Sequence, residues 1–301
     1  MHSNVEARYQ KALTELGVRT RWYQTDTDLY YAAVIGAVDG IQNADIIARA
    51  RQFDVVLPPT HALHLIKQTL AAITASRDLE VEAFVADVDA VTEPLRKAVR
   101  SKRLRKLAGA VVVATNNGGF EVVADRVGTM YTAWNEKYRL RTNALDLTLA
   151  GITDAAGLDP VTALDRAEAV DQNLTQTGYS NEWDVARILA IDESRQATDR
   201  FLRLASEQRG RRRKPLTDRR HLIAVAALAD HPSHELVDLV SHRFESLRAG
   251  RFRPDQKTRL TLAALLTLGA SVPPENKLRT VFHGFAIREH YVSSYAEATS
   301  G

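Results

Sequence analysis

The sequence contains no cysteine, and this absence removes several kinds of chemistry at once. Disulfide bonds, cysteine metal sites and a cysteine nucleophile are all excluded. A chain without cysteine fits a reducing compartment, so we predict a cytoplasmic protein.

Long apolar runs are also missing. No run approaches the roughly 20 residues that a membrane-spanning helix needs. The N-terminal stretch, MHSNVEARYQKALTEL, is polar and lacks the apolar core of a signal peptide. We therefore expect no membrane insertion.

Neither sign of charge dominates, since 40 Lys and Arg face 37 Asp and Glu, for a net charge of +3. Dedicated nucleic-acid binders usually concentrate more positive charge than this. The motifs of common enzyme classes are missing as well: there is no Walker loop, no G-x-G-x-x-G, no G-x-S-x-G and no H-E-x-x-H. No catalytic residue can be named, no cofactor is expected, and the balance favours a protein that is not an enzyme.

What the sequence does contain is an alternation of two kinds of segment. Apolar, Ala-rich segments begin at anchors that lie about 38 residues apart, which is inside the range of two-helix repeats. Each is followed by a more charged, amphipathic segment. The regularly spaced anchors are Leu107, Leu145, Val185, Leu222 and Leu260, and two less regular copies begin at Leu29 and Leu63.

The amphipathic segments have the spacing of helices with one solvated side. In the clearest, residues 233–247, the apolar residues Leu236, Val240, Phe244 and Leu247 step by three or four and share one helix face. The last of these outer helices is expected at Lys277–His290. An isolated helix pair could not bury both of its apolar faces, whereas stacked neighbours can.

We therefore predict an all-α fold: a single domain over 1–301, made of about seven helical-hairpin repeats stacked as an α-solenoid or α/α superhelix. The approximate units are 22–60, 61–106, 107–143, 144–182, 183–220, 221–258 and 259–292, followed by a frayed tail at 293–301.

Two stretches resist a purely helical interpretation. AVVVATNNGGFEVVA, at 110–124, has Val-rich flanks around Asn-Asn-Gly-Gly, as a β-hairpin does. Helix is favoured because both flanks fall in phase with the repeat, and the alternative is an α+β fold with a hairpin there. Phe53–Pro59 is a weaker strand signal of the same kind. Pro94 interrupts a helical pattern and predicts a break followed by a short extra helix.

The alternation of Ala-rich and amphipathic helices resembles the HEAT-type α-solenoids. The stretch FRPDQKTRLTLAALLTLG is faintly similar to an uncharacterised bacterial all-helical family of unknown function. The first resemblance implies a stacked helical array, and such arrays commonly present a binding surface. The second implies no function.

Two runs of basic residues could grip phosphate groups through charge and counterion release. A solvated helix face and an exposed loop would explain the same residues without a ligand. The nucleic-acid hypothesis further requires the two runs to converge on one surface. The candidates are Arg96, Lys97, Arg100, Lys102, Arg103, Arg105 and Lys106 in the first run, and Arg209, Arg211, Arg212, Arg213 and Lys214 in the second.

Aromatic residues gather near the N-terminus at Trp22, Tyr23, Tyr30 and Tyr31. Such a cluster can form a ligand or partner surface, although a cap that closes the end of the stack is favoured.

Histidines gather late in the chain, and His231, His234 and His242 are weak metal candidates. Their place at a turn and on an outer helix favours surface or capping roles, and we expect no metal.

Three functions are thus carried forward. The first is an interaction or scaffold protein with an unknown protein or peptide partner. The second is nucleic-acid binding through the basic runs, and the third is an enzyme of unknown reaction inside a closed helical ring. The oligomeric state is not predicted.

Overall fold

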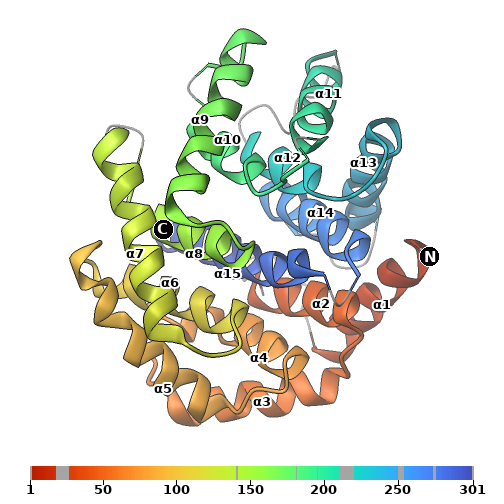
Figure 1. Cartoon of the computed structure of the whole chain (residues 1–301). Helices are drawn as coiled ribbons and strands as arrows, with labels where there is room; N and C mark the ends of the chain where they lie inside the picture. The colour runs from red at the N-terminus through yellow and green to blue at the C-terminus, as the bar shows by residue number, and fades with distance from the viewer. Residues whose placement is uncertain are drawn as a thin grey trace.

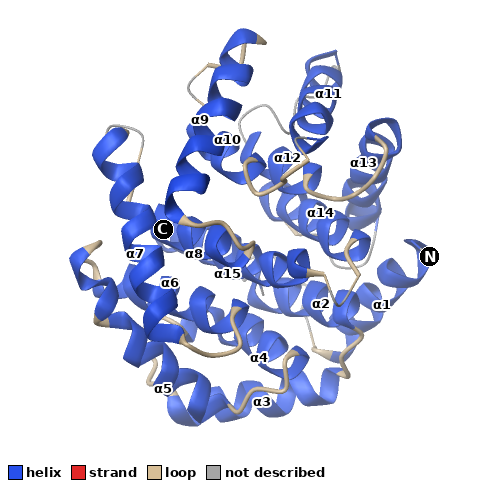
Figure 2. Cartoon of the chain, viewed as in Figure 1, coloured by secondary structure: helices blue, strands red, loops and turns tan. Residues whose placement is uncertain are grey.

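Helices account for all of the regular structure in the part of the chain that is described. The computed structural model describes residues 2–17, 27–139, 142–180, 182–194, 196–210, 220–249, 254–273 and 276–299. These ranges contain helices and loops but no strand (Figure 2), which confirms the all-α prediction.

The α-helices are α1 (His2–Glu15), α2 (Thr27–Asp39), α3 (Asn43–Val56), α4 (Lys67–Ser76), α5 (Val81–Thr92), α6 (Lys102–Thr115), α7 (Phe120–Lys137), α8 (Asp146–Ala155), α9 (Pro160–Gln176), α10 (Trp183–Leu189), α11 (Gln196–Gly210), α12 (Arg220–Ala227), α13 (Ser233–Ala249), α14 (Gln256–Ser271) and α15 (Lys277–Thr299). Two short 3₁₀ helices, η1 (His64–Ile66) and η2 (Pro94–Lys97), precede α4 and α6.

The alternative of a β-hairpin at 110–124 is wrong. Helix α6 continues to Thr115, and α7 begins at Phe120 after a turn that contains two glycines with positive φ. The valines of α6 are buried on every side. Burying one valine gains about 1.5–3 kcal/mol, whereas its weaker helix propensity costs less than about 0.7 kcal/mol. Packing therefore decides in favour of the helix.

The other local predictions have different outcomes. The strand indicated by Phe53–Pro59 is wrong, because α3 runs through Val56. The break at Pro94 is confirmed, since α5 ends at Thr92 and η2 follows. Asp159 caps the start of α9, where its carboxylate accepts the N–H groups of Val161 and Thr162.

The Ala-rich segments form the interior helices α2, α4, α6, α8, α10, α12 and α14. In α8 and α14, for example, nearly every residue is buried. Helices such as α5 and α9 keep one solvated side, and their buried residues follow helical spacing. The predicted division into apolar inner helices and amphipathic outer helices matches these burial patterns.

Each outer helix packs most extensively on the inner helix that follows it in the chain. Helix α3 packs mainly on α4, α5 on α6, α7 on α8, and α13 on α14. The predicted units instead join each inner helix to the outer helix after it, so their boundaries do not coincide with the closest packing. Helix α14 also packs against α2, which brings the two ends of the chain of inner helices together.

Helix α15 differs from the prediction. The sequence pattern assigned Lys277–His290 to an outer, partly solvated helix, but residues 281–291 are all buried. Helix α15 packs against α2, α4, α6, α8 and α14, and Figure 1 shows it running among them. Its charged residues misled the prediction because they are compensated inside the protein.

Gly284 lies where α15 comes very close to α8, and this explains why the position is a glycine. A Cβ added to Gly284 would lie 2.7 Å from Cγ1 of Ile152 in α8, nearer than two such atoms can come. Only a residue without a side chain lets α15 lie this close to α8. No helix in the described ranges is long and apolar enough to cross a membrane.

Candidate functional site

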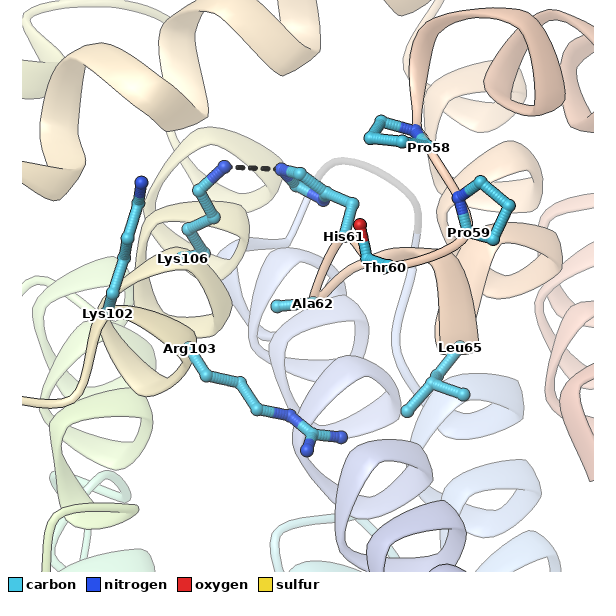
Figure 3. Close-up of a pocket in the computed structure, with 9 residues that line it drawn as sticks. All are labelled: Pro58, Pro59, Thr60, His61, Ala62, Leu65, Lys102, Arg103 and Lys106. Carbon is cyan, nitrogen blue, oxygen red and sulfur yellow. Dashed lines mark hydrogen bonds between the residues drawn. The ribbon is translucent and has the colours of Figure 1, made fainter.

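Two segments that are distant in sequence line an open cavity of about 480 Å³. One is the loop and 3₁₀ turn before α4, from Pro58 to Leu65, and the other is the N-terminal part of α6. This volume lies within the range of about 300–1,000 Å³ that is usual for ligand sites. The lining residues are Pro58, Pro59, Thr60, His61, Ala62, Leu65, Lys102, Arg103 and Lys106 (Figure 3). We call this cavity the basic pocket.

The start of α6 makes one wall of the basic pocket positive. Ser101 caps the helix by accepting the N–H of Leu104 at 3.4 Å. The first turn then carries Lys102 and Arg103 and no acidic residue. A helix N-terminus already bears partial positive charge, so a cation there costs about 0.3–1 kcal/mol where an anion would stabilise the helix. The pocket is therefore positive at some expense to the stability of α6.

Lys106, one turn further along α6, meets groups from two other elements. Its Nζ lies 3.0 Å from Oδ1 of Asp89 in α5 and also contacts Nε2 of His61. Burial, and next the positive charge of Lys106, hold the pKa of His61 below its usual value of 6.5. His61 is therefore neutral at neutral pH.

Arg103 occupies a different edge of the basic pocket. Figure 3 shows Lys102 and Lys106 side by side on α6, with the ammonium end of Lys106 against His61, whereas Arg103 extends from α6 in another direction. The Arg103 guanidinium carbon lies 5.0 Å from the ring centroid of Tyr291 in α15. This cation–π contact holds the side chain in place.

The structure divides the first basic run by role. Arg96, Lys97 and Arg100 are exposed and do not line the pocket. Arg105 is a correction to the nucleic-acid prediction, because it is buried and donates to the carbonyl oxygens of Val99 and Arg100, both at 3.0 Å. It closes the turn before α6 and is not available to a ligand.

The second basic run cannot be compared with the first. Arg209 belongs to α11, but its side chain lies outside the described part of the chain. Arg211, Arg212, Arg213 and Lys214 also lie outside the described residues. Whether the two runs share a surface stays a prediction.

The predicted aromatic surface needs correction for the two members that can be seen. Tyr30 and Tyr31 are buried, because α2 is an inner helix covered by α1, α4, α14 and α15. Tyr31 stacks on His290 with ring centroids 4.7 Å apart, and its hydroxyl lies 3.2 Å from Oγ of Ser293. These tyrosines are core residues. Trp22 and Tyr23 lie outside the described residues.

The candidate metal histidines occupy separate places. His231 lies in the turn before α13, and the side chain of His234 is outside the described part. His242 is exposed, and its Nε2 lies 3.4 Å from Glu6 of α1. The described residues offer no group of three or more His, Asp or Glu side chains suited to a metal ion.

Sequence reasoning missed a buried polar centre around α15. Arg187 of α10 is fully buried, lies 3.0 Å from Asp146 and 2.6 Å from Asp184, and has the rings of Trp134 and Trp183 against its guanidinium. The aromatic rings and the two carboxylates together compensate the buried charge.

The charges on α15 itself are compensated in the same way. Glu289 contacts Arg288 and lies 3.4 Å from Nε2 of His221. Burial alone would raise the pKa of Glu289, but Arg288 and His221 outweigh burial and lower it to about 2. The neighbouring His290 contacts Thr69 at 2.9 Å, and burial lowers its pKa to about 3. Glu289 is therefore charged and His290 neutral over the physiological range.

His61 was also missed. The fold brings the loop that holds His61 against the start of α6, and Lys106 contacts its Nε2. No local pattern in the sequence signals this contact, so sequence reasoning had no signal that could have found it.

No protein-family model, curated protein or solved structure matches this chain. Its function therefore has to be argued from the geometry of the site.

Proposed function

We propose that this protein binds a phosphate-bearing ligand in the basic pocket. The observation that carries the proposal is the lining itself: Lys102, Arg103, Lys106 and His61 converge on one cavity, and none of the lining residues is a carboxylate. Solvated surface cations are usually interspersed with acids. A concave cluster of one sign is instead an arrangement that concentrates an oppositely charged ligand.

The expected strength of such a site can be bounded. A hydrogen bond to a charged group contributes about 1.5–3 kcal/mol, so losing two ammonium donors would weaken binding by at least about tenfold. The helix N-terminus adds a favourable term for an anion. Asp89 competes for Lys106 but is half exposed, so solvent screens its charge.

The nucleic-acid hypothesis uses the same chemistry and is the closest alternative. It requires cations outside the pocket as well, and Arg96, Lys97 and Arg100 are exposed as it would need.

The other hypotheses have less support. A scaffold needs a broad apolar or mixed groove, whereas the exposed large apolar side chains of the described residues, Val55, Leu65, Val122 and Val161, come from four different elements. An enzyme in a closed ring needs a deep central pocket, and α15 runs through that region. A protein partner and a cytoplasmic location stay predictions.

We also infer that the helices form one array of hairpins that has closed on itself. The regular packing of each outer helix on the next inner helix and the contact of α14 with α2 support this arrangement. It goes beyond the HEAT-like resemblance, because an open solenoid would leave those two helices apart.

The test is a calorimetric titration of the full chain with sodium phosphate and sodium pyrophosphate. We compare Lys102→Ala/Lys106→Ala with Arg96→Ala/Lys97→Ala, which removes the same charge from the same run outside the pocket. The pocket variant is expected to bind at least about tenfold more weakly, and the control within about twofold of the wild type. Equal losses in both variants, or no binding by the wild type, would overturn the proposal.

A further inference from the structure

The two walls of the basic pocket differ in chemistry. All of its cations come from α6. The facing segment, residues 58–65, adds the polar Thr60 and His61 and otherwise contributes apolar side chains, which are those of Pro58, Pro59, Ala62 and Leu65. Figure 3 shows Arg103 and Leu65 extending toward one another from the two walls. A ligand that fills the pocket therefore meets positive charge on one side and apolar surface on the other.

Leu65 is the largest apolar side chain of this wall, and the fold leaves it exposed. Its neighbours Leu63 and Ile66 are fully buried, whereas Leu65 is 44% exposed. Among the exposed large apolar side chains of the described residues, Leu65 alone lines the pocket. Single exposed apolar side chains are common on protein surfaces, but this one faces a cavity whose other wall is cationic. A ligand with an apolar part would remove this surface from water.

The basic pocket is also larger than a phosphate group alone. A phosphate has five non-hydrogen atoms, and at about 30 Å³ for each group of water size it occupies roughly 150 Å³. The cavity has a volume of about 480 Å³. Space for a substituent therefore remains once the phosphate has met the cations, and the wall that borders this space opposite α6 is mainly apolar.

Building on the proposed function, we infer that the ligand of the basic pocket is a phosphate monoester with an apolar substituent. The phosphate, which carries up to two negative charges, binds the cations of α6, and the substituent covers Leu65 and the prolines of the facing wall. A soluble aryl or alkyl phosphate and a lipid with a terminal phosphate share this chemistry.

The first test compares methyl phosphate with phenyl phosphate by calorimetric titration of the full chain at pH 7.5. The two ligands carry the same charged group and differ in their apolar surface. Covering about 60 Å² of apolar surface is enough for a tenfold gain in affinity, so phenyl phosphate should bind at least about tenfold more tightly. Equal affinities would overturn the inference and leave the proposed function intact.

Vesicles distinguish the two sources of such a phosphate. The full chain is sedimented with phosphatidylcholine vesicles that contain either phosphatidic acid or phosphatidylglycerol at equal charge. A larger bound fraction with phosphatidic acid identifies a lipid with a terminal phosphate as the ligand. Equal fractions, together with tight binding of phenyl phosphate, identify a soluble ester.

Leu65 provides the sharper test, because its replacement should affect one ligand and not the other. Leu65→Ala should weaken phenyl phosphate binding by at least about threefold and leave methyl phosphate within about twofold. Lys102→Ala/Lys106→Ala should weaken both by at least about tenfold. Val122→Ala is the matched control, since it also shortens an exposed apolar side chain but lies at the start of α7, outside the pocket. It should leave both affinities within about twofold.

The possible failures lead to different conclusions. An equal loss for both ligands in Leu65→Ala would indicate a disturbed pocket, and unchanged phenyl phosphate binding would show that the substituent does not contact Leu65. Either result would overturn the inference. Absence of binding of both ligands by the wild type would instead refute the proposed function itself.

Discussion

The centre of the protein and the basic pocket both hold clusters of cations, but the two regions differ in how many carboxylates lie close to those cations. In the centre, Arg187 lies within 3.0 Å of Asp146 and 2.6 Å of Asp184, and Arg288 contacts Glu289. In the pocket, the basic residues outnumber the acids, and Asp89 approaches only Lys106 among the described contacts.

This difference separates structural charge from charge that serves binding. A buried cation without partners would cost several kcal/mol, so the centre can hold arginines only because carboxylates and aromatic rings compensate them. A solvent-accessible cation can remain without a carboxylate because water stabilises it. An excess of positive charge in an accessible, concave region therefore costs little folding free energy and can bind an anion.

The largest expected effect comes from breaking the compensated centre. Replacing Arg187 by alanine leaves the fully buried Asp146 without its cation, and should lower the free energy of unfolding by about 3–5 kcal/mol. Urea denaturation followed by circular dichroism measures this loss. Arg187→Lys keeps the charge but not the planar fork, so its loss should be smaller.

The matched control is Arg96→Ala. Arg96 and its partner Glu93 are both 70% exposed, and the pair should contribute less than about 0.5 kcal/mol. If the two alanine variants lost similar stability, the distinction between a compensated interior and a solvated surface would be incorrect.

A second test concerns how tightly α15 is held in the centre. Gly284→Ala places a methyl group against Ile152 of α8, and should destabilise the protein by about 1–3 kcal/mol through overpacking. Gly128→Ala is the control, because its new Cβ would meet Ala98 at 3.9 Å, an ordinary contact.

At Gly128 the better helix propensity of alanine should leave stability unchanged or raise it by up to about 1 kcal/mol. Thermal unfolding of both variants is the measurement. Equal melting temperatures would show that α15 can shift away from α8 without loss, contrary to the close packing described above.

The sequence was sufficient to predict the helices but not the role of α15. Apolar anchors and amphipathic spacing report which face of a helix is buried, so α13 and the break at Pro94 were predictable. The charges of Arg288 and Glu289 made α15 resemble an outer helix. Only the three-dimensional arrangement reveals that they neutralise each other inside the protein.

Only part of the candidate site, its run of basic residues, could be predicted from the sequence. A run of basic residues was evident at Arg96–Lys106, but its pattern could not distinguish Arg105, which caps a turn, from Lys102 and Lys106, which face a cavity. The difference depends on which side of α6 meets the loop at His61, and that loop is about 40 residues away in sequence. Local spacing carries no information about such a contact.

The third effect on stability has the opposite sign to the losses expected at Arg187 and Gly284, and is smaller than either. Lys102 occupies the first turn of α6, where its charge opposes the helix dipole. Lys102→Glu should therefore raise the free energy of unfolding by about 0.3–1 kcal/mol at low salt, while phosphate binding falls by at least about tenfold. Lys97→Glu makes the same charge change outside the pocket and should leave binding within about twofold.

Natural sequences depart from local structural preference mainly at functional sites. If Lys102 is retained for a ligand, its replacement should therefore raise stability and weaken binding. Urea denaturation and calorimetric titration of the same Lys102→Glu preparation measure both quantities. A variant that loses stability, or one that binds phosphate like the wild type, would place Lys102 with the structural cations of the centre.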